Sequence, residues 1–369
     1  MYLKVLSAAA ALILTAVCLA EPLPTVPPLS TAAPAETPSP TAIETEEPRN
    51  GTVTLTITCA GDCTLGGDAA KGTKGRFDRV AAKQGLDYFF QNFRSLFESD
   101  DITIVNLEGP LTDSTDEHKS SGYVFRGDPS YASILSGSSV ELANLANNHA
   151  LDYREQGLTD TKAALDAAGV YHCGFEEIAY FDVKGVRVGA VGLTKWESGK
   201  SEMVAAVQAA RPNCDLLIVN VHWGTEKDFS HTSEQRAQAH AMIDAGADIV
   251  IGTHSHVYGG IELYNGRYIL YSLGNFCFGG NSDPNNKSTM VFRQTFGIDL
   301  SSGSVTAGGI SVIPARISGK NSGNDYQPYI LAAKQGKALL EKIDAVSELD
   351  FKTANWLPDS YEVQNSIYG

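Results

Sequence analysis

The chain has 369 residues, of which 43% are apolar, and a formal net charge of −15. A chain of this length and composition can bury a sizeable hydrophobic core. The acidic balance excludes a nucleic-acid partner, because no basic patch could offset the repulsion from phosphates. An anionic substrate would therefore need local cations or metal ions to bind.

Residues 1–20 have the pattern of a signal peptide. Lys4 supplies the positive charge, an apolar run covers residues 5–17, and Ala20 offers a small side chain for cleavage. The run is short for a membrane-spanning helix. Cleavage with release, lipid anchoring at Cys18 and an uncleaved anchor are the three outcomes that this segment allows.

Residues 21–50 are rich in Pro, Thr, Ala and Glu and contain almost no large apolar side chains. Such a segment cannot bury a core, so we predict a disordered, semi-extended stalk. The folded domain is then expected to span residues 51–350, followed by a poorly structured tail at 351–369. Together these features predict a bacterial extracytoplasmic protein, either secreted or tethered to the outer face of the cell membrane.

Strand and helix patterns alternate through the predicted domain and indicate an α/β (α+β) fold. The Asn265-Gly266 pair between two apolar runs predicts a hairpin with a type I′ turn. The five cysteines beyond residue 20 lack the spacing of a disulfide scaffold. The main expected strands are 52–59, 101–106, 140–146, 215–221 and 248–251, and the expected helices are 87–98, 156–168, 201–210, 234–245 and 327–346.

Polar side chains follow each of the five main strands. Because the carboxyl ends of parallel strands meet at one edge of an open α/β sheet, we expect these side chains to form a single cluster. In an extended segment, the i, i+2 spacing of His254 and His256 would place both imidazoles on the same side of the backbone. The alternative is that each residue caps its own turn. The residues are Asp62, Glu108, Asn148 with His149, His222, and His254 with His256.

A cluster of Asp, Glu, Asn and His that needs no thiolate suits two divalent metal ions, with Mn, Fe, Zn and Mg as the candidates. Two neighbouring ions need a bridging carboxylate, here Glu108 or Asp62, and can hold a hydroxide between them. That hydroxide would attack a phosphorus or carbonyl centre. His149 could protonate the leaving group, with Asp152 holding its ring. Arg126 could clamp an anion, although a surface salt bridge explains it equally well.

Six short motifs occur in order along residues 52–280. They are Ala60-Gly-Asp62, Asn106-Leu-Glu108, Asn147-Asn-His149, Val221-His-Trp-Gly-Thr-Glu226, Gly252-Thr-His-Ser-His256 and Ser272-Leu-Gly-Asn-Phe276. As a set they resemble the CapA/PgsA family of poly-γ-glutamate capsule biosynthesis proteins, a branch of the calcineurin-like metallophosphoesterases. The resemblance implies a four-layer αββα sandwich of the metallophosphoesterase type, a single catalytic-like domain with a C-terminal helix.

The resemblance also implies roles for the polar residues. Glu108 would take the bridging position and His149 would be the general acid. Arg126, Glu226 and Asn275 are the expected substrate contacts. The sequence departs from the wider superfamily at the first motif, where Asp-x-His is replaced by Asp62-Cys63-Thr64. The implied metal ligands are Asp62 with His256 on one ion, and Asn148 with His222 and His254 on the other.

We therefore expect an extracytoplasmic CapA-like protein of capsule or exopolymer biosynthesis, of the poly-γ-glutamate type. Its reaction would be metal-dependent hydrolysis of a phosphoester, or of an amide such as the γ-glutamyl bond of an anionic polymer. The alternative is a non-catalytic scaffold or polyanion-binding subunit of a membrane polymer synthase or export complex, whose subunits would then be its partners. A nucleotidase-like scavenger is a third and weaker alternative, since no nucleoside-binding domain is evident after residue 280.

Overall fold

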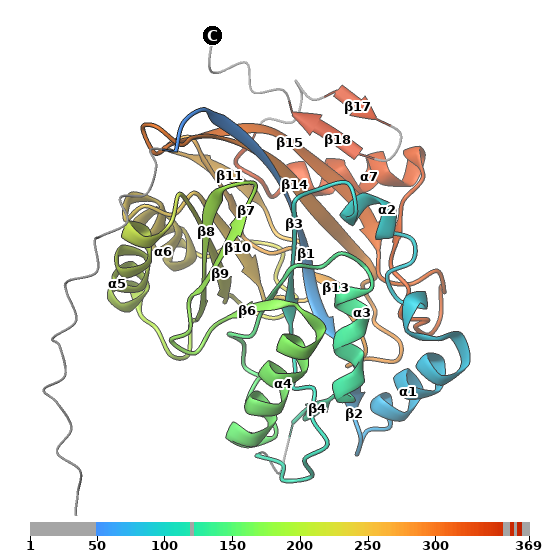
Figure 1. Cartoon of the computed structure of the whole chain (residues 1–369). Helices are drawn as coiled ribbons and strands as arrows, with labels where there is room; N and C mark the ends of the chain where they lie inside the picture. Colours follow the sequence, from blue (N-terminus) through green and yellow to red (C-terminus); the bar gives the residue numbers. More distant parts are fainter. Residues whose placement is uncertain (1–48, 119–121, 350–354, 358–359, 364–369) are drawn as a thin grey trace, which may run out of the picture. The chain divides into compact units, whose positions relative to one another are not determined.

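The computed structural model describes residues 49–118, 122–349, 355–357 and 360–363 (Figure 1). The chain divides into two units, Met1–Glu47 and Pro48–Gly369, and the described residues all belong to the second. The predicted signal peptide and nearly all of the predicted stalk lie outside the described residues. Among the helices that the structure describes, none combines the length and the apolarity that crossing a membrane requires.

The first sheet has ten strands in the order β17-β18-β15-β14-β1-β3-β5-β6, with β13 beside β1 and β16 beside β15. Its half from β1 to β6 is parallel, whereas β14 and β15 run antiparallel to their neighbours. The strands are β1 (Thr52–Thr64), β3 (Ile102–Leu107), β5 (Leu142–Asn144), β6 (Tyr171–Cys173), β13 (Asn275–Phe278), β14 (Ser288–Asp299), β15 (Ser304–Arg316), β16 (Tyr329–Ile330), β17 (Asn355–Leu357) and β18 (Ser360–Val363).

The second sheet has six strands in the order β11-β12-β10-β9-β8-β7. The four strands from β12 to β8 are parallel, and hairpins add β11 and β7 at the two edges. The β11–β12 turn has positive φ at both Asn265 (49°) and Gly266 (74°), which confirms the predicted type I′ turn. The strands are β7 (Ala179–Val183), β8 (Val186–Thr194), β9 (Leu216–His222), β10 (Ile249–Thr253), β11 (Ile261–Tyr264) and β12 (Arg267–Leu270).

Helices and a small ribbon complete the fold. β2 (Gly67–Asp68) pairs with β4 (Phe125–Arg126) apart from the two large sheets. The predicted C-terminal helix is present as a shorter helix that adds Leu339, Leu340 and Ile343 to the core between the sheets. The helices are α1 (Thr73–Gln84), α2 (Arg94–Phe97), α3 (Ala132–Ser136), α4 (Arg154–Ala168), α5 (Lys200–Ala210), α6 (Ser233–Asp244) and α7 (Ala333–Asp344), with 3-10 turns η1 (Leu86–Tyr88), η2 (Pro129–Tyr131) and η3 (Arg211–Asn213).

Successive residues of the central strands face different layers. Ile218 of β9 lies in the core between the sheets, whereas Leu217 and Val219 pack with residues of α5 and α6. In the same way Ile104 of β3 faces the second sheet, and Val105 packs with residues of α1 and α4. The order is helices, sheet, sheet, helices, which confirms the predicted αββα sandwich (Figure 1).

The predicted helix at 87–98 is wrong in extent, because the structure has only η1 and the single turn α2 there. Phe90, Phe93 and Phe97 gather around Phe276, with ring centroids 5.1, 4.9 and 5.9 Å from it. The helix-like spacing of these phenylalanines therefore reflects the burial of their rings on one side of a series of turns. A short helix and a series of turns both satisfy that spacing.

Other elements also depart from the predicted pattern, among them one helix and two strands. The sequence patterns do not predict α1, which buries only Thr73, Phe77 and Ala81 and so has a weak apolar face. β17 and β18 lie within the predicted tail, where their backbones extend the first sheet beside β15. For these two strands the prediction of a poorly structured tail is wrong.

Candidate metal centre

β1 brings Asp62 to the centre from inside a strand. The prediction ends the first strand before Asp62, but β1 continues past it by changing partners. Its earlier part pairs antiparallel with β14, whereas Asp62 lies opposite Asn275 of the parallel strand β13. Gly61 permits this change, since a Cβ there would lie 1.8 Å from the carbonyl oxygen of Gly274.

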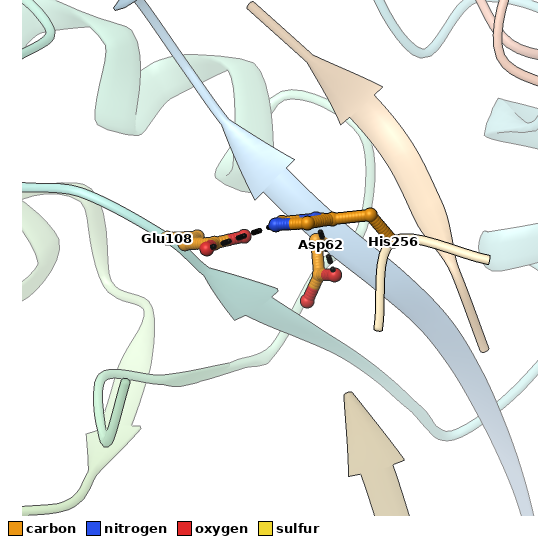
Figure 2. Close-up of side chains that lie close together, drawn as sticks. All are labelled: Asp62, Glu108 and His256. Atoms are coloured by element: carbon orange, nitrogen blue, oxygen red, sulfur yellow. Dashed lines mark ion pairs between the residues drawn. The ribbon is translucent and has the colours of Figure 1, made fainter. Parts of the chain in front are cut away.

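Asp62, Glu108 and His256 form the first ligand group, and their candidate ligand atoms all lie within 4.8 Å of one another (Figure 2). Asp62 Oδ2 is 3.3 Å from His256 Nδ1, and Glu108 Oε1 is 3.7 Å from His256 Nε2. Both carboxylates are fully buried. Asp62 Oδ2 and both oxygens of Glu108 have no hydrogen-bond partner among the described residues.

Asn148, His222 and His254 form the second ligand group. His222 Nε2 lies 2.9 Å from Asn148 Oδ1 and 3.2 Å from His254 Nδ1. Glu108 Oε1 is 3.8 Å from the same His222 nitrogen. Glu108 therefore lies between the two groups, at the position where a shared carboxylate ligand would be.

The spacing of these atoms fits divalent ions. Metal–ligand distances of about 2.0–2.2 Å place neighbouring ligand atoms about 3–4 Å apart. The contacts of His256 in the first group, 3.3 and 3.7 Å, and those of His222 in the second, 2.9 and 3.2 Å, are close to that range. The unpartnered carboxylate oxygens are what a buried cation would satisfy, because burying an ionised acid without a partner is costly.

The electrostatics of the histidines also suit a metal centre. Burial and the neighbouring His254 and His256 hold the pKa of His222 well below its usual range. Burial, with the charge of His256, lowers the pKa of His254 to about 3. Both rings are thus neutral, the form in which imidazole binds metals. Burial alone would lower the pKa of His256, but Glu108 and Asp62 raise it above its usual range.

The two histidines after β10 reach the centre through an unusual backbone. β10 ends at Thr253, and His254 and His256 have φ values of 99° and 57°. The expected extended segment is therefore wrong, because both residues adopt left-handed conformations that side-chain-bearing residues rarely take. Ser255 Oγ donates to Val257 O at 2.8 Å within this turn. The rings still lie close together, with centroids 6.0 Å apart.

A network of amide side chains supports the ligands. Asn106 Nδ2 donates to Asp62 Oδ1 at 2.8 Å, and Asn106 Oδ1 accepts from Asn144 Nδ2 at 2.9 Å. Asn147 Nδ2 donates to Leu107 O at 2.8 Å. The sequence pattern alone predicts no role for these asparagines. Their one signal is position, since each lies at or just beyond a strand end near an expected ligand.

His149 faces the centre with its ring held on two sides. Its Nδ1 is 2.6 Å from Asp152 Oδ2, and its Nε2 is 4.0 Å from Glu108 Oε1. Asp152 also accepts a hydrogen bond from Phe125 N at 2.7 Å. The Phe125 ring packs on the imidazole with centroids 4.2 Å apart. Phe125 is a further residue that the sequence did not single out.

A cavity of about 370 Å³ extends from His149 and His256. Glu226 and Asn275, two of the three expected substrate contacts, line it. The third, Arg126, is not among the described lining residues. Its guanidinium instead donates to the carbonyl of Ser114 and lies over the ring of Tyr153, 5.1 Å from the centroid.

The two tryptophans nearest the motifs have different environments. Trp223 is buried, and its Nε1 donates to Tyr271 O at 3.0 Å, so it belongs to the core. Trp196 is half exposed and meets the ring of His254 edge-on, with centroids 4.8 Å apart. The five cysteines that the structure describes are all free, which agrees with the absence of a disulfide scaffold.

Comparison with known proteins gives a consistent result. The PGA biosynthesis protein CapA of Bacillus subtilis is 33% identical over 230 residues, covering 55% of this chain and 60% of that protein. The capsule biosynthesis protein CapA of Bacillus anthracis is 31% identical over 253 residues, covering 61% and 60%. This chain thus spans about 60% of the length of these relatives.

A crystal structure of a novel phosphatase from Mycoplasma pneumoniae is similar with a TM-score of 0.44 and 14% identity, over 74% of this chain and 96% of that one. The family described as bacterial capsule synthesis protein PGA_cap matches residues 56–280, which is more than half of the chain and includes every motif of the centre. The chain belongs to this bacterial capsule synthesis protein family.

Proposed function

We propose that this protein is a metal-dependent hydrolase of capsule or exopolymer biosynthesis that acts outside the cytoplasm. The observation that carries the proposal is the set of buried carboxylate oxygens on Asp62 and Glu108, which no hydrogen bond from the described residues satisfies and which converge on the ring nitrogens of His256. An ionised acid in such a place needs a cation close to it. The neutral imidazoles of His222 and His254 complete a donor set typical of divalent metals.

Both ligand groups would be used. Glu108 would be shared, Asp62 and His256 would complete the site of one ion, and the second ligand group would complete the other. When bound, the two ions would supply Lewis acidity toward the scissile group and toward the attacking water.

His149 is the residue that would move a proton. Asp152 holds its Nδ1 side and the Phe125 ring covers one face, so the imidazole cannot turn away from the centre. Its Nε2 faces Glu108 across a gap of 4.0 Å. We assign His149 as the general acid that protonates the leaving oxygen or nitrogen as its bond to phosphorus or carbon breaks.

The substrate class and the location are inferred from sequence. The names of the two Bacillus relatives refer to PGA biosynthesis and to capsule biosynthesis. We therefore propose a phosphoester or γ-glutamyl substrate from a capsule or exopolymer. The signal-peptide pattern of residues 1–20 and the composition of residues 21–50 support an extracytoplasmic location.

The test measures metal content and hydrolysis together. The purified chain is loaded with Mn²⁺, its ions are counted by mass spectrometry, and hydrolysis of p-nitrophenyl phosphate and of a γ-glutamyl anilide is followed. We expect two ions per wild-type chain and one in His254→Ala. His149→Ala should keep both ions but lose activity by about 10²–10⁴-fold.

The control is His172→Ala, a buried histidine that contacts Asp166 and Glu177 outside the centre. It should keep both the ions and the activity. A wild-type protein that binds no metal after Mn²⁺ loading would refute the proposal.

One observation favours the second candidate function, a non-catalytic subunit of a polymer synthase or export complex. The first ligand group contains a single imidazole, because Thr64 stands where the wider superfamily has a histidine. In that case the capsule would be lost on deletion of the gene but would persist in a strain that carries His149→Ala. Loss of the capsule in both strains would exclude this candidate.

A further inference from the structure

The cavity beside the metal centre has walls of a distinct composition. It starts at His149 and His256 and is enclosed by β4, the loop after β9 and the loop between β13 and β14. Its volume of about 370 Å³ lies near the lower end of the range of about 300–1,000 Å³ for small-molecule sites. This is room for a ring-sized group beside the reacting atoms.

The walls of the cavity away from the metal centre are close to neutral. Histidines aside, Glu226 and Lys227 are the charged residues among the described residues that line it, and their charges offset each other. A γ-glutamyl chain carries one carboxylate in every residue. Each carboxylate that entered would need its own cation, and a single lysine cannot supply them. The walls therefore match an uncharged group better than a polyanion.

One wall is aromatic. The rings of Tyr123, Phe125 and Phe278 follow one another with centroids 5.8 and 6.0 Å apart. Phe125 packs on His149, and Phe278 lies 5.0 Å from His256, so this wall leads directly to the centre. Tyr123 is 48% exposed, and Lys71 Nζ lies 4.3 Å from its ring centroid. Aromatic faces of this kind bind the apolar faces of rings.

Amide groups line another part of the cavity. Asn286 lines it and has a buried Nδ2 that finds no acceptor in the described part of the chain, while its Oδ1 accepts from Ser288 N at 3.1 Å. Asn286 therefore lines the cavity through other atoms of its side chain, since its Nδ2 has almost no accessible surface. Three more asparagines line the same cavity. Amides can both donate to and accept from hydroxyl groups.

The amide-bearing loop is held in place before any ligand binds. Asn324 Nδ2 donates to Phe278 O at 2.9 Å and to Asn281 O at 3.0 Å. Lys287 Nζ lies 3.0 Å from Asp283 Oδ1 and donates to Asn321 O at 3.0 Å. Because the loop is fixed in this way, the position of Asn286 is a built feature of the cavity.

We propose that this cavity holds the neutral sugar ring of a sugar phosphoester, with the ring against Tyr123 and its hydroxyls toward the asparagines that line the cavity. The proposal rests on the phosphoesterase form of the proposed function. In the reaction, a water oxygen forms a bond to phosphorus and the ester P–O bond breaks, with its electron pair staying on the sugar oxygen. That oxygen takes the proton of His149, and the proton released by water replaces it. The products are the free sugar hydroxyl and phosphate.

The experiment compares a hexose phosphate with methyl phosphate, which lacks the ring, in the Mn²⁺-loaded full chain. Tyr123→Ala and Asn286→Ala should each lower kcat/KM for the hexose phosphate by between about twofold and tenfold. For each variant, the loss in kcat/KM for the hexose phosphate should exceed the loss for methyl phosphate. Tyr171→Ala is the matched control, because this tyrosine is also 48% exposed but stacks on Phe181 outside the cavity.

Calorimetry with methyl glucoside and with a γ-glutamyl trimer separates this inference from the proposed function. Methyl glucoside should bind the wild type and bind Tyr123→Ala more weakly, even if no phosphoester is hydrolysed. If methyl glucoside binds in this way but no phosphoester is hydrolysed, the proposed function is wrong and the sugar site still stands. Binding of the trimer that depends on Tyr123, or binding of the glucoside that ignores both Tyr123 and Asn286, would overturn the inference.

Discussion

The Glu108→Gln variant should be at least as stable as the wild type without metal, and less stable than the wild type when metal is bound. Both oxygens of Glu108 are buried, and neither forms a hydrogen bond with the described residues. An uncompensated buried charge costs roughly 3–5 kcal/mol. Without metal, Glu108→Gln should therefore be at least as stable as the wild type. With Mn²⁺ at 100 times its Kd, the wild type should gain about 2.7 kcal/mol, and the variant should gain little.

Urea unfolding followed by tryptophan fluorescence, in EDTA and in Mn²⁺, measures both free energies of unfolding. Glu141→Gln is the control, since this partly buried acid accepts a hydrogen bond from Thr103 N at 2.7 Å in another part of the first sheet. Its stability loss should be the same with and without metal. Equal stabilisation of the wild type and Glu108→Gln by Mn²⁺ would refute the assignment of Glu108 as the shared ligand.

Three further predictions concern the surroundings of the centre. Asn106→Ala should weaken Mn²⁺ binding by about 10–100-fold, because Asp62 loses the donor that orients it; unchanged affinity in calorimetry would contradict this. Gly61→Ala should lower the free energy of unfolding by at least about 3 kcal/mol, whereas Gly309→Ala, whose Cβ meets no described atom within 4 Å, should not. Burial raises the pKa of Asp100 to about 6 from 3.8, so its contribution to stability is complete below about pH 4 and is lost as pH rises through 6. Asp100→Asn should thus gain roughly 1–2 kcal/mol relative to the wild type between pH 4 and 7, allowing for solvent screening, and a pH-independent difference in urea titrations would count against it.

Local patterns predict much of this fold because its central strands are short apolar runs between helices. The strand before His222 and the Asn265-Gly266 turn both follow from nearest neighbours in sequence. The extension of β1 through Asp62 does not, because it depends on pairing with Asn275 from a distant part of the chain. A partner so far along the sequence leaves no trace in the local pattern.

The candidate metal centre also combines features that local sequence predicts with features that depend on distant contacts. Position at strand ends is enough to predict that Asp62, Glu108 and the histidines come together, and the structure does bring them together. It does not predict the left-handed backbone at His254, which depends on how the turn after β10 is packed. Position at a strand end also does not predict where the Arg126 side chain points. The contacts of Arg126 with Ser114 and Tyr153 depend on the course of a long loop.

The change of partner along β1 also bears on the order of folding. Asp62 is made early in synthesis, yet its neighbour Asn275 belongs to β13, which follows the whole second sheet in the chain. Contacts between such distant segments form slowly, because a long loop must close first. A nascent chain that lacks β13 carries Glu108 and His222 without the strand that fixes Asp62. The candidate metal centre would then be complete only after β13 has paired with β1.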